Sequence, residues 1–252
     1  KSGGSAANTA VGYSSFGGNS LFFGSVAKDN FGLSFKKDLN DLGIHFLSCE
    51  NSVLNKNTSK SLVLISPDGE RTMCTFLDAS VSLSLKNFDQ SVIKNNSILY
   101  LEGYLFDKNE TKQSMIDLCK IARKKGSLIS LSLSDSFCVE RHRKDFLSLI
   151  KNYVDILFGN SQEIEALLNG QAKEKMSSIA EIAVVTNGPK GANIFKANDS
   201  TFIPPIDGLD VLDTTGAGDL FAAGFLFGFS KKLTLDNCGK LATKSASHII
   251  QQ

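Results

Sequence analysis

Two aspartates bracket a turn of small residues near the end of this 252-residue chain, over the sequence DTTGAGD at 213–219. An apolar run at 220–229 follows and predicts a buried helix. Small residues at a helix start leave backbone N–H groups accessible, and the positive end of the helix dipole adds to their attraction for an anion. Asp219 would lie beside that anion as a base. The pattern suits phosphoryl transfer to a hydroxyl, although the Gly-x-Gly-Asp part alone also fits an ordinary tight turn.

A second candidate site follows the strand predicted at 154–158, where the sequence reads NSQE over 160–163. Asn160 and Glu163 offer an amide oxygen and a carboxylate, and hydrated Mg²⁺ prefers oxygen ligands. The same spacing is also that of a helix cap, with Asn160 or Ser161 at the N-cap and Glu163 in the first turn. These residues alone leave both interpretations open.

A third motif, TNGPKGA at 186–192, follows the strand predicted at 183–186. Gly188 and Gly191 would let the backbone approach a nucleotide closely. An ordinary turn between strands explains the same glycines. The sequence therefore leaves both interpretations of this motif open, a nucleotide contact and a plain connection between strands.

The start of the chain carries paired glycines, Gly3 and Gly4, ahead of a helix of small residues predicted from Ala6 to Val11. A glycine turn leading into that helix is one interpretation. Asn8, however, is unfavourable inside a helix start unless its side chain has a partner. This local conflict favours a binding role for Asn8.

An alternation of strands and helices must position these motifs. Apolar runs predict core strands at 19–26, 98–101, 128–133, 154–158 and 183–186. Helical periodicity separates them, which implies right-handed crossovers and an α/β fold with an open, mostly parallel sheet flanked by helices. Ligands of such sheets bind beyond the carboxyl ends of the strands. We therefore expect one shared cleft from the polar residues that end predicted strands: Glu102-Gly103, Gly159-Asn160 and Asn187-Gly188.

Residues 44–80 break this rhythm. Two strand-like runs flank Pro67-Asp68-Gly69-Glu70, a turn signal that predicts a hairpin. We therefore expect an α/β domain over 1–43 and 81–252, with residues 44–80 as a small β-rich insert. Because no core strand comes before the opening glycines, we also expect an N-terminal segment with a first strand ahead of Lys1.

The composition excludes several classes of protein. The chain has 27 basic and 26 acidic residues without a basic run, so neither nucleic acid nor an anionic membrane is an expected partner. No apolar run reaches the roughly 18 residues that span a bilayer. The five cysteines are scattered and contain no Cys-x-x-Cys pair, which favours free thiols in a reducing cytoplasm.

Together these motifs resemble those of the ribokinase-like sugar and nucleoside kinases, the PfkB family. The family signature Asp-Thr-x-Gly-Ala-Gly-Asp, followed by an apolar helix that contains glycine, matches 213–219 and the run after it. Its Asn-x-x-Glu, Thr-x-Gly-x-x-Gly and Gly-Gly-x-x-x-Asn motifs match 160–163, 186–191 and 3–8. The resemblance covers nearly the whole chain in family order and is nearest to the adenosine-kinase-like branch.

The resemblance implies ATP-dependent phosphorylation of a primary hydroxyl of a sugar or nucleoside, with Asp219 as the catalytic base. It implies further roles for the motif residues: an anion hole at Gly216, Ala217 and Gly218; substrate contacts at Gly3, Gly4 and Asn8; nucleotide contacts at Thr186, Gly188, Gly191 and Asn160; Mg²⁺ held through water at Asn160 and Glu163; and K⁺ near Asp213 and Thr215. A sugar-binding aspartate usual in the family would lie ahead of Lys1.

The implied partners are small molecules: ATP, Mg²⁺, K⁺ and the acceptor, which the sequence does not identify. In relatives the insert closes as a lid that excludes water and often pairs two subunits, so a homodimer is expected. The alternative is a sugar- or nucleoside-binding regulatory protein on the same scaffold, without turnover. The retained Asp219 argues against that alternative.

Overall fold

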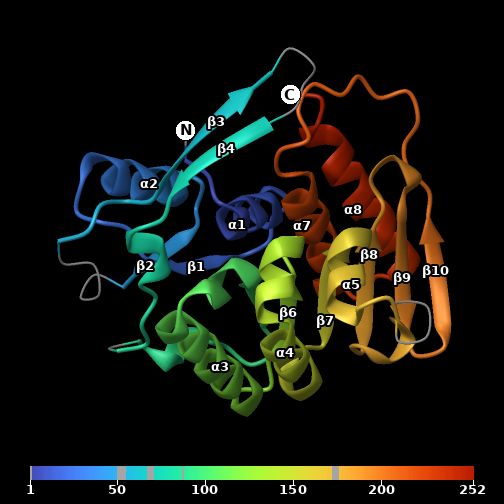
Figure 1. Cartoon of the computed structure of the whole chain (residues 1–252), viewed down its shortest axis with the longest axis horizontal. Helices are drawn as coiled ribbons and strands as arrows, with labels where there is room; N and C mark the ends of the chain where they lie inside the picture. Colours follow the sequence, from blue (N-terminus) through green and yellow to red (C-terminus); the bar gives the residue numbers. More distant parts are fainter. Residues whose placement is uncertain (1, 50–54, 67–70, 87, 172–175) are drawn as a thin grey trace.

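A six-stranded sheet with the strand order β10-β9-β8-β7-β6-β5 forms the centre of the computed structural model, which describes residues 2–49, 55–66, 71–86, 88–171 and 176–252 (Figure 1). Its strands are β5 Ile98–Glu102, β6 Leu128–Ser132, β7 Ile156–Asn160, β8 Ile182–Thr186, β9 Ala192–Lys196 and β10 Asp199–Ile203. Strands β5 to β8 pair in parallel, whereas β9 and β10 are antiparallel to their neighbours. The predicted open, mostly parallel α/β sheet is confirmed, and the antiparallel edge was not predicted.

Helices cover both faces of this sheet (Figure 1). They are α3 Asn109–Lys124, α4 Ser136–Tyr153 and α5 Ser161–Leu168 on one face, and α7 Ala217–Ser230 and α8 Leu235–Ile249 on the other. Strand side chains alternate between the two cores: Leu157 packs with the first group of helices, while Ile156 and Phe158 pack with the second. A sheet buried on both faces needs continuous apolar strands, which is why these runs stood out in the sequence.

The first part of the chain forms a second small sheet with two helices, and its first helix packs against the main domain. Its elements are α1 Ser5–Ser15, β1 Leu21–Gly24, α2 Asn30–Asp41 and β2 His45–Ser48. The strand predicted at 19–26 as a core strand is β1, but the prediction of its place was wrong: β1 pairs in parallel with β2 in a two-stranded sheet. An apolar run predicts a strand, but it does not predict the partner of that strand.

A β-hairpin follows, formed by β3 Lys60–Ile65 and β4 Arg71–Phe76. The antiparallel pairing agrees with the hairpin predicted from the sequence, while the turn signal at 67–70 lies outside the described residues. All six residues of β3 are exposed, including Leu62 at 62% and Ile65 at 61%. The division into an α/β domain and a lid over 44–80 stays a prediction, and β2, within that range, pairs with β1.

Short 3-10 segments connect the main elements: η2 Ala79–Val81, η3 Gln90–Val92, η4 Gly103–Asp107, η5 Met176–Ser178 and η6 Gly188–Lys190. Of these, η4 and η6 follow β5 and β8 directly, at the carboxyl edge of the sheet. None of the helices in the described part of the chain combines the length and apolar character needed to cross a bilayer.

Candidate active site

The small-residue turn predicted to bind an anion forms the start of α7. Gly216 is the N-cap residue with φ 79°, a left-handed conformation that favours glycine. A Cβ atom on Gly218 would meet no atom within 4 Å, so the backbone is open to an approaching group there. The first N–H groups of a helix have no partner within the helix. Of these, the Ala217 N–H group donates to the Thr214 carbonyl oxygen over 3.2 Å. The turn thus has the geometry of an anion site, with one donor already engaged.

Asp219 lies in the first turn of α7, partly exposed, and both of its carboxyl oxygens accept hydrogen bonds from α1. The Asn8 Nδ2 atom donates to Oδ2 over 2.8 Å, and the Ser5 hydroxyl is 2.6 Å from Oδ1. Burial raises the pKa of Asp219, while the hydrogen bonds from Ser5 and Asn8 act in the opposite direction. The partner that Asn8 needed inside its helix is therefore the carboxylate predicted as the base.

Close packing of α1 on α7 brings these residues together. A Cβ on Gly12 would come within 2.7 Å of the Leu220 side chain and 2.8 Å of the Ala223 Cβ, so only glycine allows this approach. Gly4 is the N-cap of α1 with φ 111°, and its carbonyl accepts from the Asn8 N–H. A Cβ on Gly3 or Gly4 would meet nothing within 4 Å. Both glycines therefore leave open backbone next to the Asp219 cluster.

Glu102, the last residue of β5, joins this cluster; the sequence placed it in the expected cleft as the polar end of a strand but assigned it no chemical role. Its side chain is buried, with one oxygen 2.8 Å from the Ser5 hydroxyl and the other 2.7 Å from the Ser134 hydroxyl. Burial raises the pKa of Glu102 to about 7; its hydrogen bonds with Ser134, Ser5 and Tyr100 oppose the rise, and the charge of Asp219 adds to it. A charged residue at the end of an apolar strand was the signal that placed it there, whereas its contact with Ser5 was not predicted.

The other predicted site residues meet at the ends of β7 and β8. Asn160 and Thr186 are register partners in the parallel pair formed by these strands. The Ser161 hydroxyl donates to Asn187 Oδ1, which joins the turns after the two strands. The structure therefore places the Asn-x-x-Glu and Thr-x-Gly-x-x-Gly segments side by side.

Asn160 and Glu163 form a capping box at the start of α5. Asn160 Oδ1 accepts from the Glu163 N–H over 2.9 Å, and the Glu163 carboxylate accepts from the Asn160 N–H and side-chain amide over 3.0 and 2.8 Å. The cap predicted as one of two interpretations is confirmed. The Mg²⁺ role is not excluded by it, since carbonyl and carboxylate oxygens can accept more than one contact.

The donor set at this cap also fits a hydrated Mg²⁺ ion. Glu163 is buried, and burial raises its pKa to about 7, opposed by the hydrogen bond from Asn160 and helped by the charge of Asp135. A nearby cation would offset both unfavourable contributions. Oxygen ligands with retained water are the usual surroundings of Mg²⁺ in proteins. Asn160 and Glu163 would hold it.

Tyr104 lies between the two groups of carboxylates. Its half-exposed side chain donates from the hydroxyl to the Ser134 carbonyl oxygen over 3.0 Å. The pKa of Tyr104 is raised, first by burial and then by four carboxylates: Asp135, Glu102, Glu163 and Asp219. Negative charge from both groups therefore converges at one edge of the sheet, which supports the shared location expected from the strand ends.

The two glycines of the loop after β8 differ in their surroundings. Gly188 has φ 55° and open space around it, whereas a Cβ on Gly191, at φ 85°, would lie 2.3 Å from the Ile203 carbonyl oxygen. Packing and the positive φ both require glycine at 191. Of the two, Gly188 leaves the backbone more open to a ligand, and the nucleotide contact of Gly191 stays a prediction.

Asp213 and Thr215 form a local turn ahead of α7. Asp213 Oδ1 accepts from the Thr215 N–H over 2.8 Å and from its hydroxyl over 2.7 Å. The Asp213 N–H donates to the Ile250 carbonyl oxygen at the end of α8. These contacts explain the loop geometry without an ion, and the K⁺ site stays a prediction.

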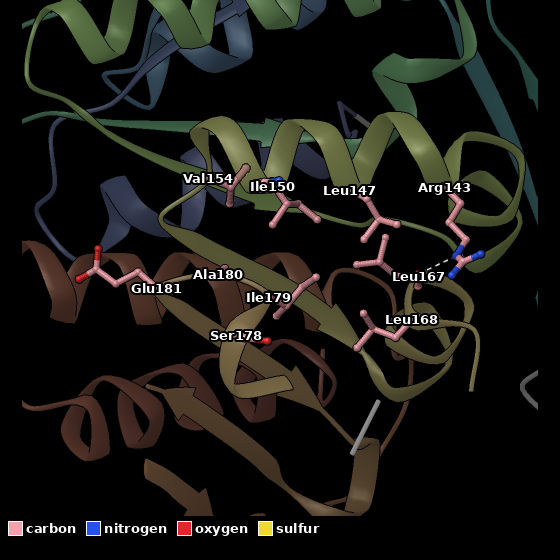
Figure 2. Close-up of a pocket in the computed structure, with 11 residues that line it drawn as sticks. Arg143, Leu147, Ile150, Val154, Leu167, Leu168, Ser178, Ile179, Ala180 and Glu181 are labelled. Atoms are coloured by element: carbon pink, nitrogen blue, oxygen red, sulfur yellow. Dashed lines mark hydrogen bonds between the residues drawn. The ribbon is translucent and has the colours of Figure 1, made fainter. Parts of the chain in front are cut away.

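A pocket of about 540 Å³ lies elsewhere, between α4, α5 and the segment 178–181 (Figure 2). Val154 and Glu181 line it and come just before β7 and β8, so the pocket is at the amino ends of these strands. Most other lining residues shown in Figure 2 are apolar. The pocket contains none of the predicted site residues.

Comparison with known proteins decides the family. Residues 1–252 match the family described as pfkB family carbohydrate kinase. The chain belongs to the PfkB family of carbohydrate kinases. The resemblance drawn from the motifs is thereby confirmed, and the family of this PfkB kinase is one of phosphotransferases.

Two similar kinases and one protein that shares the fold were found. The crystal structure of adenosine kinase from Sinorhizobium meliloti is similar with 37% identity and a TM-score of 0.93, over 99% of this chain and 78% of that one. A probable fructokinase of Arabidopsis thaliana is 30% identical over 92% of this chain and 71% of its own length. A putative ribokinase II from E. coli, solved with ATP and Mg²⁺, shares the fold at a TM-score of 0.90 and 16% identity, over 99% and 82% of the two chains.

Proposed function

We propose that this PfkB kinase transfers the γ-phosphoryl group of ATP to a primary hydroxyl of a sugar or nucleoside, with Asp219 as the catalytic base. The observation that carries the proposal is the place of Asp219. It lies in the first turn of α7, partly exposed, beside the open backbone of Gly218, and Ser5 and Asn8 hold both of its oxygens.

In this mechanism Asp219 accepts the proton of the acceptor hydroxyl as that oxygen attacks the γ-phosphorus. Its raised pKa makes it a stronger base than an exposed aspartate. The N–H groups of Gly216 and Gly218 stabilise the charge on the transferred group. Ala217 would exchange its bond to the Thr214 carbonyl for a phosphate oxygen.

Gly3, Gly4 and Asn8 would hold the acceptor. The Asn8 amide contacts Asp219 directly, so a hydroxyl that bonds to the Asn8 side chain also lies next to the base. The open backbone at Gly3 and Gly4 lets hydroxyl groups approach the main chain. The S. meliloti adenosine kinase makes adenosine the first acceptor to test, and the fructokinase relative makes fructose the second.

The nucleotide would lie along the ends of β7 and β8, where Asn160, Thr186 and Gly188 meet. Mg²⁺, when bound, neutralises phosphate charge, and Asn160 and Glu163 would hold it through water. The Asp213–Thr215 turn would hold K⁺, which replacement of K⁺ by Na⁺ in the assay would test. The E. coli neighbour solved with ATP and Mg²⁺ supports this pair of ligands for the fold.

The hairpin β3–β4 would close over the acceptor and join two subunits. The side chains of Leu62, Leu64 and Ile65 on β3 and of Met73 on β4 are 51% to 62% exposed, so apolar side chains reach solvent on both faces of the hairpin. Exposed apolar surface of this kind marks an interaction site. A second copy of the hairpin would cover it, and light scattering of the purified protein would give the mass of the dimer.

An acceptor panel tests the proposed function. The purified protein receives ATP, Mg²⁺ and one acceptor at a time, including adenosine, fructose and ribose, and ADP release is followed. We expect turnover with at least one acceptor and a loss of about 10³-fold in Asp219→Asn. Ser15→Ala, at an exposed position of α1 away from the cluster, is the matched control. Binding of an acceptor without ADP release would favour the regulatory alternative, and full turnover in Asp219→Asn would remove the base from its role.

A further inference from the structure

A single hydroxyl stands between two carboxyl groups of the site. The Ser5 Oγ atom is 2.6 Å from Asp219 Oδ1 and 2.8 Å from Glu102 Oε1, both within hydrogen-bond distance. The second oxygen of each carboxyl group also has a partner: the Asn8 amide contacts Asp219, and the Ser134 hydroxyl contacts Glu102. Three elements meet here, since Ser5 begins α1, Glu102 ends β5 and Asp219 lies in α7.

The number of protons in this chain of oxygens follows from its geometry. A serine hydroxyl has one proton and can donate to only one of the two carboxyl groups. The second contact is a hydrogen bond only if the other carboxyl carries a proton and donates it to Ser5 Oγ. If both groups were ionised, one carboxylate would face the serine oxygen without a proton between them. The arrangement therefore holds one negative charge over the two acids.

Burial indicates which acid holds the proton. Glu102 is 5% exposed, whereas Asp219 is partly exposed and accepts from the Asn8 amide, which favours its ionised form. The titratable groups around Glu102 are all acidic or phenolic: Asp219 on α7, Tyr100 on β5, and Tyr104 on η4 with Asp135 beyond it. Helix α1 has no charged side chain, and Asp219 is the only one on α7. Hydrogen bonds with Ser134 and Tyr100 favour ionised Glu102, but burial is the largest influence on it and keeps the proton on Glu102.

We propose that Glu102 is a positioning residue that acts through Ser5, holding the one proton of a Glu102–Ser5–Asp219 chain so that Asp219 is the only charged acid beside the reacting groups. This inference rests on the proposed role of Asp219 as base. While Glu102 is protonated, Ser5 donates fully to Asp219 and orients its carboxylate. When Glu102 ionises, the two acids compete for the Ser5 proton, and a second negative charge opposes the approach of the γ-phosphate.

Carbon NMR of the protein labelled at the glutamate carboxyl carbon tests the shared proton without turnover. The resonance absent from the Glu102→Gln variant belongs to Glu102. We expect it to titrate near neutral pH in the wild type, consistent with its pKa of about 7, and at lower pH in Asp219→Asn, where the neighbouring charge is gone. Titration at the ordinary glutamate pH, unchanged in Asp219→Asn, would overturn the proposal.

The pH dependence of kcat/KM provides the second readout. The wild type is expected to lose about tenfold between pH 7 and pH 9, as Glu102 ionises. Glu102→Gln, whose amide donates to Ser5 at every pH, is expected to lack this decline. Ser5→Ala is expected to lose about tenfold at all pH values, because Asp219 loses a charge-assisted hydrogen bond. An alkaline decline in Glu102→Gln equal to that of the wild type would contradict the proposal.

Controls separate a failure of this inference from a failure of the proposed function. Glu110→Gln, an exposed glutamate in the first turn of α3, should leave the titration and the pH profile unchanged. Urea unfolding at pH 6 shows whether each variant is folded. Full turnover in Asp219→Asn would remove the base itself, whereas an inactive Asp219→Asn together with an ordinary Glu102 titration would remove only the proton chain.

Discussion

Two buried glutamates at the same edge of the sheet, Glu163 and Glu102, share the same chemistry but differ in the origin of their partners. Burial raises the pKa of each to about 7. Glu163 bonds to Asn160, three residues away, within one helix start. Glu102 bonds to Ser5, 97 residues away, and Ser5 in turn contacts Asp219, 214 residues away. The first arrangement forms wherever the helix forms, and the second exists only in the complete fold.

The two arrangements also differ in what they contribute. The capping box satisfies N–H groups that α5 would otherwise leave without a partner, so it stabilises the helix. The Ser5 cluster places two acids close together, which opposes folding whenever both are ionised. We therefore expect changes in the cap to lower stability at every pH, and changes in the cluster to alter the pH dependence of both stability and turnover. Because the cap also has the proposed Mg²⁺ role, its changes should affect turnover as well.

The largest expected effect separates turnover from stability at Asp219. Asp219→Asn should reduce turnover by about 10³-fold, while its free energy of unfolding stays equal to or rises above that of the wild type. The physical reason is that burial disfavours the charged form of Asp219, and an asparagine can still accept from Asn8 and donate to Ser5. ADP release and urea unfolding measure the two quantities. A clear loss of stability would show that the carboxylate has a structural role as well.

The next-largest effect is on the pH dependence of the free energy of unfolding, which Glu102 should influence. Since its folded pKa, about 7, lies above the unfolded value near 4.5, the folded state binds more protons between these pH values. The contribution of Glu102 to the free energy of unfolding is therefore fully present below pH 4.5 and is lost as the pH rises to about 7. The loss is on the order of 2–3 kcal/mol. Glu102→Gln should remove this loss. The variant should therefore be more stable than the wild type at pH 8, but not at pH 4.5. Equal urea midpoints of the two proteins at pH 8 would contradict the prediction, and Glu110→Gln is the exposed control.

A smaller effect is expected at the cap. Asn160→Ala should cost about 1 kcal/mol of unfolding free energy, because the Glu163 N–H loses its acceptor and the Glu163 carboxylate loses a donor. Asn160→Ser keeps an N-cap acceptor and should cost less. Urea unfolding at pH 7 gives both values. If the two variants are equally destabilised, the cap is not the source of the loss.

The smallest effect is expected at an exposed ion pair. It gives the reference change in stability against which variants of the cap and of the Ser5 cluster are compared. Lys37 Nζ and the Asp41 carboxylate are 2.5 Å apart on the surface of α2, four residues apart. Solvent screens such a pair, so Lys37→Ala should leave the urea midpoint within the scatter of repeated measurements. A shift as large as that of Asn160→Ala would mean that the stability scale of the other predictions needs revision.

Much of the fold followed from the sequence because its signals are local. Continuous apolar runs predicted β5 to β8, and helical periodicity predicted the helices that cover them. The places of β1 and of the antiparallel edge β9–β10 were not predicted, since an apolar run of four or five residues contains no information about its pairing partner. The hairpin β3–β4 agrees with the prediction because its two strands are close in the sequence.

The sequence alone determined the chemical groups available to this protein: a carboxylate in the first turn of a helix, open glycines beside it, and an Asn-x-x-Glu cap at a strand end. Each of these spans only a few residues, so spacing and propensity specify it. The tertiary structure decided that Asn8 and Ser5 contact Asp219 and that Glu102 lies one hydroxyl away. Those contacts depend on the close approach of α1 and α7 at Gly12, and such an approach arises from the packing of the whole chain rather than from any single segment.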